Sequence, residues 1–173
     1  GPFAMISNKA GGLLVSDTYN SRIQAIDNDG SYKDGFGANY PGAIAQDEEG
    51  NIYVVGAHRA VVTKYSSSGE KLLEFGKPGD GDGEFTLESL EGYTFGPSGI
   101  AVDDEGGLIY ISDTEAHRIQ VFDKEGNFVR TLGGFGKPGE GGLFHPRDIV
   151  FDENGFLWVA DTGNHRVVKI HVK

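Results

Sequence analysis

The stretch "YISDTEAHRIQVF" at residues 110–122 decides the fold, because the chain repeats it. "LVSDTYNSRIQAI" at 14–26 and "WVADTGNHRVVKI" at 158–170 superimpose on it without a gap, and "YVVGAHRAVVTKY" at 53–65 is a more distant copy. The successive copies begin 39, 57 and 48 residues apart. A unit of this size that recurs with connections of variable length indicates a repeat architecture.

Each copy is predicted to form the middle of a four-stranded unit. In the third unit, "GIAVD" (99–103) and "LIYIS" (108–112) are the expected first and second strands, and "RIQVFD" (118–123) and "FVRTLG" (128–133) are the third and fourth. The nearly continuous apolar character of the second strands predicts burial on both faces. The more polar fourth strand is typical of a sheet edge.

A short turn of the form D-x-x-G or S-x-x-G marks the joints between these strands. A type I turn followed by a glycine with positive φ closes a hairpin in this way, and the Asp or Ser side chain accepts hydrogen bonds from the turn backbone. We expect such turns at 27–30, 47–50, 66–69, 103–106, 123–126 and 152–155. The aspartates of these turns are therefore predicted to be structural.

The repeat predicts an all-β protein with the architecture of a β-propeller, because one four-stranded sheet cannot bury both faces alone whereas stacked sheets can. The pattern P-x-x-I-A-x-D-x-x-G-x-x-Y-V-x-D-T-x-N-x-R-I resembles the NHL-repeat propellers over essentially the whole chain. The resemblance implies a single domain of about four four-stranded blades, with units at about 1–40, 41–96, 97–145 and 146–173.

The resemblance also bears on completeness, since most propellers of this family are expected to have six blades. The fourth unit stops after its third strand, so the chain is predicted to be a fragment or an open part of a six-bladed propeller. Uncovered blade faces and unpaired strand edges favour association. The two alternatives are a homo-oligomer and completion of the ring by another chain.

The composition narrows the function classes. The chain has 173 residues, which suits one domain, and its 28 glycines suit a protein with many tight turns. A net charge of -11 argues against nucleic acid and against membrane surfaces as partners. The absence of cysteine excludes disulfides and thiolate metal sites. We hold a small preference for an extracytoplasmic or secreted location.

An aspartate and an arginine five residues apart recur in three of the four copies. The pairs are Asp17 with Arg22, Asp113 with Arg118, and Asp161 with Arg166. Three copies of one catalytic site in so short a chain would be unusual, so we interpret each pair as a structural clamp across the hairpin between the second and third strands. The second unit has Gly56 and Val61 instead and is predicted to lack the clamp. No catalytic residue is assigned.

The two faces of the predicted propeller differ in character. The D-x-x-G turns make one face acidic and uniform, whereas the second-to-third hairpins and the connections between blades emerge on the other face, which we call the loop face. Irregular loops carry function more often, so ligand binding is expected there. The candidates near the mouth of the central channel are Gly42, Ser98, Arg147, Asp148 and His145. Arg147 beside Asp148 could equally be a neutralised pair.

The connection at 76–97 contains "DGDGE", which spaces Asp80, Asp82 and Glu84 two residues apart. Three such carboxylates could wrap a hard cation such as calcium. The stretch lacks the glycine and the distant bidentate acid of the helix-loop-helix calcium pattern, and a solvated loop explains it as well. Calcium is the one cofactor that the sequence brings into consideration.

Two function classes remain open. The first is a non-enzymatic scaffold that recognises a protein, peptide or glycan through the loop face. The alternative is a lyase or hydrolase with a site at the channel mouth, because similar propellers include a zinc-dependent lyase of peptide amidation. That lyase places histidines after the blade-start prolines, where this chain has Gly42, Ser98 and Arg147, so a three-histidine zinc cage is not expected. The resemblance also offers RNA binding, which requires a basic face. The net charge of -11 argues against it.

Overall fold

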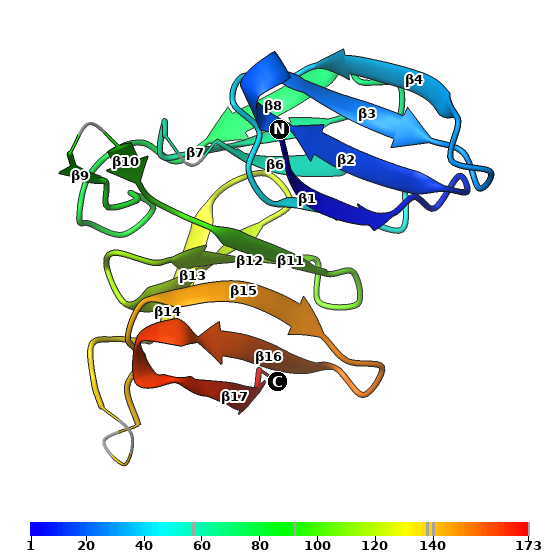
Figure 1. Cartoon of the computed structure of the whole chain (residues 1–173). Coiled ribbons are helices and arrows are strands. Elements are labelled where there is room, and N and C mark those ends of the chain that lie inside the picture. The colour runs from blue at the N-terminus through cyan, green and yellow to red at the C-terminus, as the bar shows by residue number, and fades with distance from the viewer. Residues whose placement is uncertain (57, 92, 138, 140, 173) are drawn as a thin grey trace.

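The computed structural model shows four antiparallel sheets that follow one another as the blades of a propeller (Figure 1). It describes residues 1–56, 58–91, 93–137, 139 and 141–172. Each blade is a meander in which neighbouring strands along the chain are also neighbours in the sheet. The all-β propeller prediction is confirmed.

The strands are bounded as follows. Blade 1 consists of β1 (Pro2–Ser7), β2 (Leu13–Asp17), β3 (Arg22–Ile26) and β4 (Tyr32–Gly37), and blade 2 of β5 (Ile44–Gln46), β6 (Ile52–Gly56), β7 (Val61–Tyr65) and β8 (Lys71–Phe75). Blade 3 consists of β11 (Gly99–Asp103), β12 (Leu108–Asp113), β13 (Arg118–Asp123) and β14 (Phe128–Gly133), and blade 4 of β15 (Pro146–Phe151), β16 (Phe156–Asp161) and β17 (Arg166–His171).

The blades are held together by apolar side chains on their facing surfaces. One buried cluster joins blades 2 and 3, with Val55 and Phe75 on one side and Ile111 and Phe122 on the other. Equivalent clusters join blades 1 and 2 and blades 3 and 4. The first strands of consecutive blades, β1, β5, β11 and β15, lie in contact in that order. The stacked sheets therefore place four inner strands around one cavity.

The burial of the second strands depends on the position of the blade. All of β6 is buried, and β12 is buried except for its first residue, as the sequence predicts. In blades 1 and 4, the first and last of the stack, the prediction of burial on both faces is wrong. Leu13 of β2 is 38% exposed and Trp158 of β16 is 37% exposed. No described blade covers these faces, so their apolar side chains meet solvent.

Five of the six short turns have the predicted geometry, with the glycine N–H bonded to the carbonyl of the first turn residue and a glycine φ between 77° and 85°. The turn after β11 differs. Gly106 donates its N–H to the Asp103 side chain, and Gly107 takes the left-handed conformation with φ of 65°. The second glycine lengthens this turn by one residue.

The hairpins between the second and third strands contain a feature that the sequence reasoning missed. A non-glycine residue at the same repeat position adopts a left-handed conformation in every blade, and these residues are Ser21, Ala60, His117 and His165, with φ from 51° to 57°. In blades 1 and 4 the residue ends a 3-10 turn, η1 (Thr18–Asn20) or η2 (Thr162–Asn164). Within the described residues no helix is long and apolar enough to cross a membrane.

The long connection between blades 2 and 3 contains structure that was expected to be irregular. A two-stranded hairpin, β9 (Glu88–Leu90) and β10 (Tyr93–Phe95), projects from the loop face (Figure 1). His58, on the hairpin between β6 and β7, places Nδ1 2.8 Å from the Thr94 carbonyl oxygen. This contact ties the added hairpin to blade 2.

Replacement of His165 by glycine is expected to raise the free energy of unfolding by about 0.5–1 kcal/mol. The left-handed conformation costs a non-glycine residue about 1–2 kcal/mol, and glycine avoids this cost. Part of the gain is lost because glycine gives up more conformational entropy on folding. His165 is exposed, so little packing is lost. Urea denaturation measures the change. His165→Ala is the matched control and should leave stability nearly unchanged, since alanine keeps the backbone cost. Equal stabilisation by both substitutions would contradict the explanation.

Asp152 forms a local network with the single tryptophan of the chain. The Trp158 indole N–H donates to Asp152 Oδ2 over 2.9 Å, and Lys169 Nζ lies 3.4 Å from the same oxygen. The indole hydrogen bond, the Phe156 and Asn154 N–H groups and Lys169 lower the pKa of Asp152 to about 2. Since its folded pKa lies below the unfolded value, Asp152 contributes stability above about pH 4 that is lost as the pH falls toward 2.

The fluorescence of Trp158 should therefore report the protonation of Asp152, with a midpoint near pH 2 in the intact chain and no such step in Asp152→Asn. Far-UV circular dichroism recorded in parallel separates this local change from acid unfolding. A midpoint near pH 4 would show that the indole hydrogen bond does not stabilise the ionised form of Asp152.

Candidate functional site

The three Asp–Arg pairs lie where the second strand of a blade ends and the third begins. The arginine Nε donates to the aspartate Oδ2 over 2.9 Å for Asp17, 2.8 Å for Asp113 and 2.7 Å for Asp161. In each pair the two residues are directly opposite in the sheet register. Blade 2, with Gly56 opposite Val61, has no such pair.

In blades 3 and 4 the clamp also binds the connection from the preceding blade. Asp113 Oδ1 accepts the Thr86 N–H over 3.1 Å, and Arg118 Nη2 donates to the Gly81 carbonyl over 2.8 Å. Gln120 adds bonds to Gly83 and Glu84. The clamp is thus a docking site for a glycine-rich loop, a role that the sequence reasoning did not assign to it.

Blade 4 repeats this arrangement. Asp161 Oδ1 accepts the Phe144 N–H over 2.7 Å, and Arg166 Nη2 donates to the Gly142 carbonyl over 2.6 Å. Burial alone would raise the pKa of Asp161, but the hydrogen bonds from Phe144, Asn164 and Arg166 lower it. For Asp113, which is more deeply buried, the effect of burial is larger than that of Arg118 and the hydrogen bonds, so its pKa is raised.

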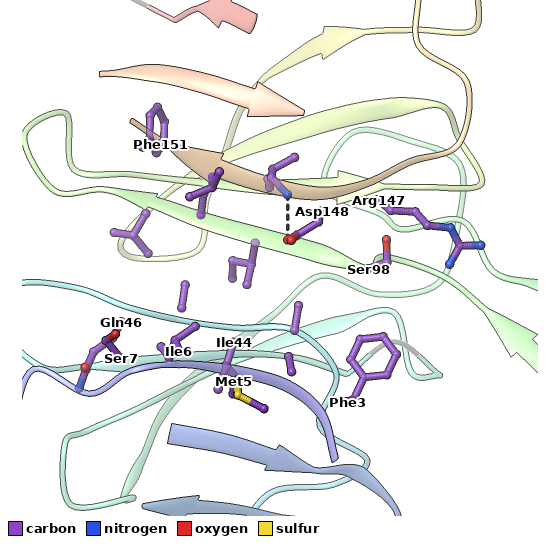
Figure 2. A pocket seen from close by; sticks show the side chains of 18 of the residues that line it. Phe3, Met5, Ile6, Ser7, Ile44, Gln46, Ser98, Arg147, Asp148 and Phe151 are labelled. Atoms are coloured by element: carbon purple, nitrogen blue, oxygen red, sulfur yellow. Dashed lines mark hydrogen bonds between the residues drawn. The ribbon is translucent and has the colours of Figure 1, made fainter. Parts of the chain in front are cut away.

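The four inner strands enclose a cavity of about 700 Å³, which is the central channel (Figure 2). Its middle is apolar, with Ile44 and Ile100 beside the exposed side chains of Met5 and Val150. Ser7 and Gln46 lie toward one end of the cavity, and Ser98 and Arg147 toward the other, which opens on the loop face. The channel therefore offers an apolar wall with polar groups at its ends.

A second cavity of about 280 Å³ lies at the mouth of the channel on the loop face. We call it the mouth pocket. Its walls include four exposed aromatic side chains from four different segments, Phe3, Tyr19, Tyr40 and Phe95, which are 60%, 77%, 45% and 40% exposed. Edge-on packing of Tyr40 against His58, with ring centres 6.0 Å apart, helps to hold this wall. The sequence reasoning missed these aromatics, because they occupy no common repeat position.

Arg147 borders both the channel and the mouth pocket. The alternative of a neutralised pair with Asp148 is wrong in this structure, because Asp148 Oδ1 accepts the Ile149 N–H over 3.0 Å and its side chain lies apart from the guanidinium (Figure 2). Among the described residues, no ion pair or hydrogen bond joins a side chain to the Arg147 guanidinium, although its charge helps to lower the pKa of Glu115 in the same pocket. A positive group is thus available to a ligand.

The remaining predicted mouth residues have different surroundings. Ser98 borders both cavities, and its hydroxyl lies 2.6 Å from that of Thr114. Gly42 lines the mouth pocket and donates its N–H to the Val55 carbonyl. His145 places Nδ1 3.3 Å from Glu115 Oε2, and Glu115 lines the mouth pocket. Burial raises the pKa of Glu115, which His145 opposes.

The calcium candidate is not supported by the geometry. Glu84 Oε1 pairs with Lys77 Nζ over 3.0 Å, and Asp80 Oδ1 accepts the Thr86 hydroxyl. Within the part of the chain that the structure describes, Asp80, Asp82 and Glu84 do not form a group that could hold a metal ion, and no other set of three His, Asp or Glu residues does. The loop is held instead by the clamp of blade 3.

Comparisons with known proteins agree with this architecture. The family model of the NHL repeat matches residues 96–122 and 145–170. Protein brain tumor of Drosophila melanogaster is 36% identical over 89 residues, which are 51% of this chain and 8% of that protein. Protein SUPPRESSOR OF QUENCHING 1, chloroplastic, of Arabidopsis thaliana is 34% identical over 141 residues, which are 74% of this chain and 13% of that protein.

Among solved structures, that of a streptogramin B lyase superimposes with a TM-score of 0.75 at 18% identity, and the match covers 99% of this chain and 52% of that one. At this identity the likeness shows the fold alone. The chain spans a small part of its curated relatives and about half of the solved structure. The predicted resemblance to NHL-repeat propellers is confirmed.

The clamps are expected to differ in their contribution to stability. Arg118→Ala and Arg166→Ala should each lower the free energy of unfolding by about 3 kcal/mol, because they leave a fully buried aspartate unpaired and release a loop. Arg22→Ala should cost less, about 1 kcal/mol, since the Arg22 side chain is 46% exposed. Urea denaturation of the three variants measures this order. Equal losses in all three would show that the loop contacts add nothing.

Proposed function

Because the chain carries NHL repeats on the blades of a β-propeller, we propose that it is a binding module that recognises a protein or peptide segment at the mouth of its channel. The observation that carries the proposal is the mouth pocket, where four exposed aromatic side chains lie beside the unpaired guanidinium of Arg147. No set of side chains with catalytic geometry is needed for this function.

The chemistry of the mouth pocket suits a protein partner. Aromatic residues and arginine are enriched at protein interfaces, where they supply most of the binding energy. Soluble proteins rarely leave large aromatic groups clustered in solvent without a function. The four aromatic side chains come from the start of β1, the hairpin between β2 and β3, the connection between β4 and β5, and β10. A partner would therefore contact blades 1 and 2 together with the connection to blade 3.

The charges favour a ligand that carries a carboxylate. Arg147 has a free guanidinium, whose planar fork binds a carboxylate through two parallel hydrogen bonds. A peptide that presents an acidic side chain next to an aromatic or aliphatic one would place both groups in the mouth pocket. A glycan could stack on the same aromatics, but a neutral sugar would offer the Arg147 guanidinium no bidentate ion pair.

A lyase or hydrolase remains the alternative, and one observation favours it. His145 and Glu115 form a pair beside the mouth pocket, and imidazole and carboxylate groups are common general acids and bases. The structural likeness to a lyase supports the fold but not the activity. His145 itself does not line either cavity of the described site, and it would have to act through Glu115.

A library of random peptides displayed on phage tests the proposal. Selection against the immobilised chain should enrich peptides with Asp or Glu next to an aromatic residue. Their affinity should fall about tenfold in Arg147→Gln, which corresponds to the loss of one charged contact of about 1.4 kcal/mol. Tyr40→Ser should weaken binding similarly, since Tyr40 lines the mouth pocket.

Lys33→Gln is the matched control. Lys33 lies on β4, the outer strand of blade 1, where it pairs with Asp27, and it does not line the mouth pocket. Binding that is unaffected by Arg147→Gln would place the ligand elsewhere and contradict the proposal. Mass spectrometry of the bound peptides distinguishes the alternative, which predicts cleavage or elimination that is lost in Glu115→Gln.

A further inference from the structure

The hairpins between the second and third strands present three side chains to the mouth pocket from one repeat position. The sixth position of the aligned stretches holds Tyr19 in blade 1, His58 in blade 2 and Glu115 in blade 3. All three residues line the mouth pocket. The repeat therefore places a carboxylate beside the aromatic walls of the pocket that Arg147 borders.

Glu115 is a buried carboxylate with one oxygen that the described protein groups leave unused. Its side chain is 7% exposed, and His145 Nδ1 lies 3.3 Å from Oε2. Among the described residues, no hydrogen bond or ion pair engages Oε1. The described side-chain atoms that are both fully buried and without a partner are limited to Thr131 Oγ1. Oε1 of Glu115 therefore keeps access to solvent, which the mouth pocket provides.

The surroundings of Glu115 leave its charge only partly compensated. Burial raises its pKa, which His145 and Arg147 oppose, while the carboxylates of Glu88 and Asp113 raise it further. Histidine changes its charge between about pH 5 and 8, so an imidazole is an incomplete counter-ion at neutral pH. A buried carboxylate is costly unless it is paired, so a cation in the mouth pocket would be stabilised by Glu115.

Glu115 and Arg147 lie in the same pocket without pairing. Both residues line the mouth pocket, and the charge of Arg147 lowers the pKa of Glu115, so the two groups act on each other. Within the part of the chain that the structure describes, no ion pair joins them. Two opposite charges that are held apart in one pocket are complementary to a ligand that carries both charges, with its cation at Glu115 and its anion at Arg147.

The chemistry around Glu115 suits an organic cation better than a metal ion. Calcium and magnesium require several oxygen ligands, and among the described residues Glu115 belongs to no group of three that could hold a metal. An ammonium or guanidinium group is bound well by one carboxylate, and it is also attracted to an aromatic face within about 6 Å. The mouth pocket offers such faces, including those of Tyr19 and Phe95.

We propose that Glu115 is a cation-binding residue of the mouth pocket, and that the partner is a peptide segment with a lysine or arginine close to its acidic side chain. This inference rests on the proposed function and adds a second charge to the ligand. The acid of the segment binds Arg147, and the base binds Glu115. A segment with acidic groups alone would be repelled by Glu115 and would leave its charge uncompensated.

Selection from a random peptide library against the intact chain and, separately, against Glu115→Gln tests the assignment. Peptides enriched on the intact chain should contain a basic residue close to the acidic one. Those enriched on Glu115→Gln should keep the acid and lose the base, because glutamine preserves the shape of the side chain and removes its charge. Glu125→Gln is the matched control, since Glu125 is exposed on the turn between β13 and β14, outside the mouth pocket, and it should select the same peptides as the intact chain.

Titration calorimetry then measures the contact in an enriched peptide and in a copy whose basic residue is replaced by norleucine, which has an aliphatic stem but no charge. The basic residue should strengthen binding about tenfold on the intact chain and on Glu125→Gln. On Glu115→Gln the gain should be less than about twofold. Because the second change is made in the ligand, the comparison on the intact chain does not depend on the stability of any variant.

The outcomes separate this inference from the proposed function. Binding that is weakened by Arg147→Gln but shows no preference for a basic residue would refute the cation-binding role of Glu115 and leave the proposed function in place. An equal preference on the intact chain and on Glu115→Gln would place the cation elsewhere and also refute the assignment. If no library peptide binds the intact chain, both the inference and the proposed function are wrong.

Discussion

The buried carboxylate of the clamp is the interaction on which the rest of the structure depends. Asp113 and Asp161 are fully buried, and a buried charge is tolerated only when it is paired and fully hydrogen-bonded. The arginine satisfies one oxygen, and a main-chain N–H of the incoming loop satisfies the other. The charge thereby fixes both the hairpin of its own blade and the path of the chain from the previous blade. In blades 3 and 4 this double attachment couples the position of the blade to that of the loop before it.

The contacts that stack the blades differ in kind from the side chains that line the mouth pocket. Strand pairing and apolar stacking use equivalent positions in successive blades, and loop docking uses equivalent positions in blades 3 and 4. The mouth pocket is lined by the start of β1, the hairpins of blades 1 to 3, the connection between blades 1 and 2, and β10.

The fold could be predicted from the sequence because the repeat aligns Asp17, Asp113 and Asp161 at strand ends, which fixes strand order and register together. The same alignment hid the docking role of the clamp, since the loop partners Gly81, Thr86 and Phe144 contribute main-chain atoms that leave no signature in the side-chain pattern. Arg147 and Ser98 were found because they follow blade-start prolines. Tyr19, Tyr40 and Phe95 were not, because each belongs to a different type of segment and only the stacking of blades brings them together.

The acidic turns on the face opposite the mouth pocket have a consequence for how a partner arrives. Besides the turn aspartates, they carry Asp29, Glu48, Glu49, Asp104, Glu125 and Glu153, so this face is rich in carboxylates. An anionic partner would be repelled there, whereas the guanidinium of Arg147 borders the mouth pocket at the other end. Such steering of a charged partner depends on ionic strength, because charges are screened over the Debye length of about 8 Å in physiological salt.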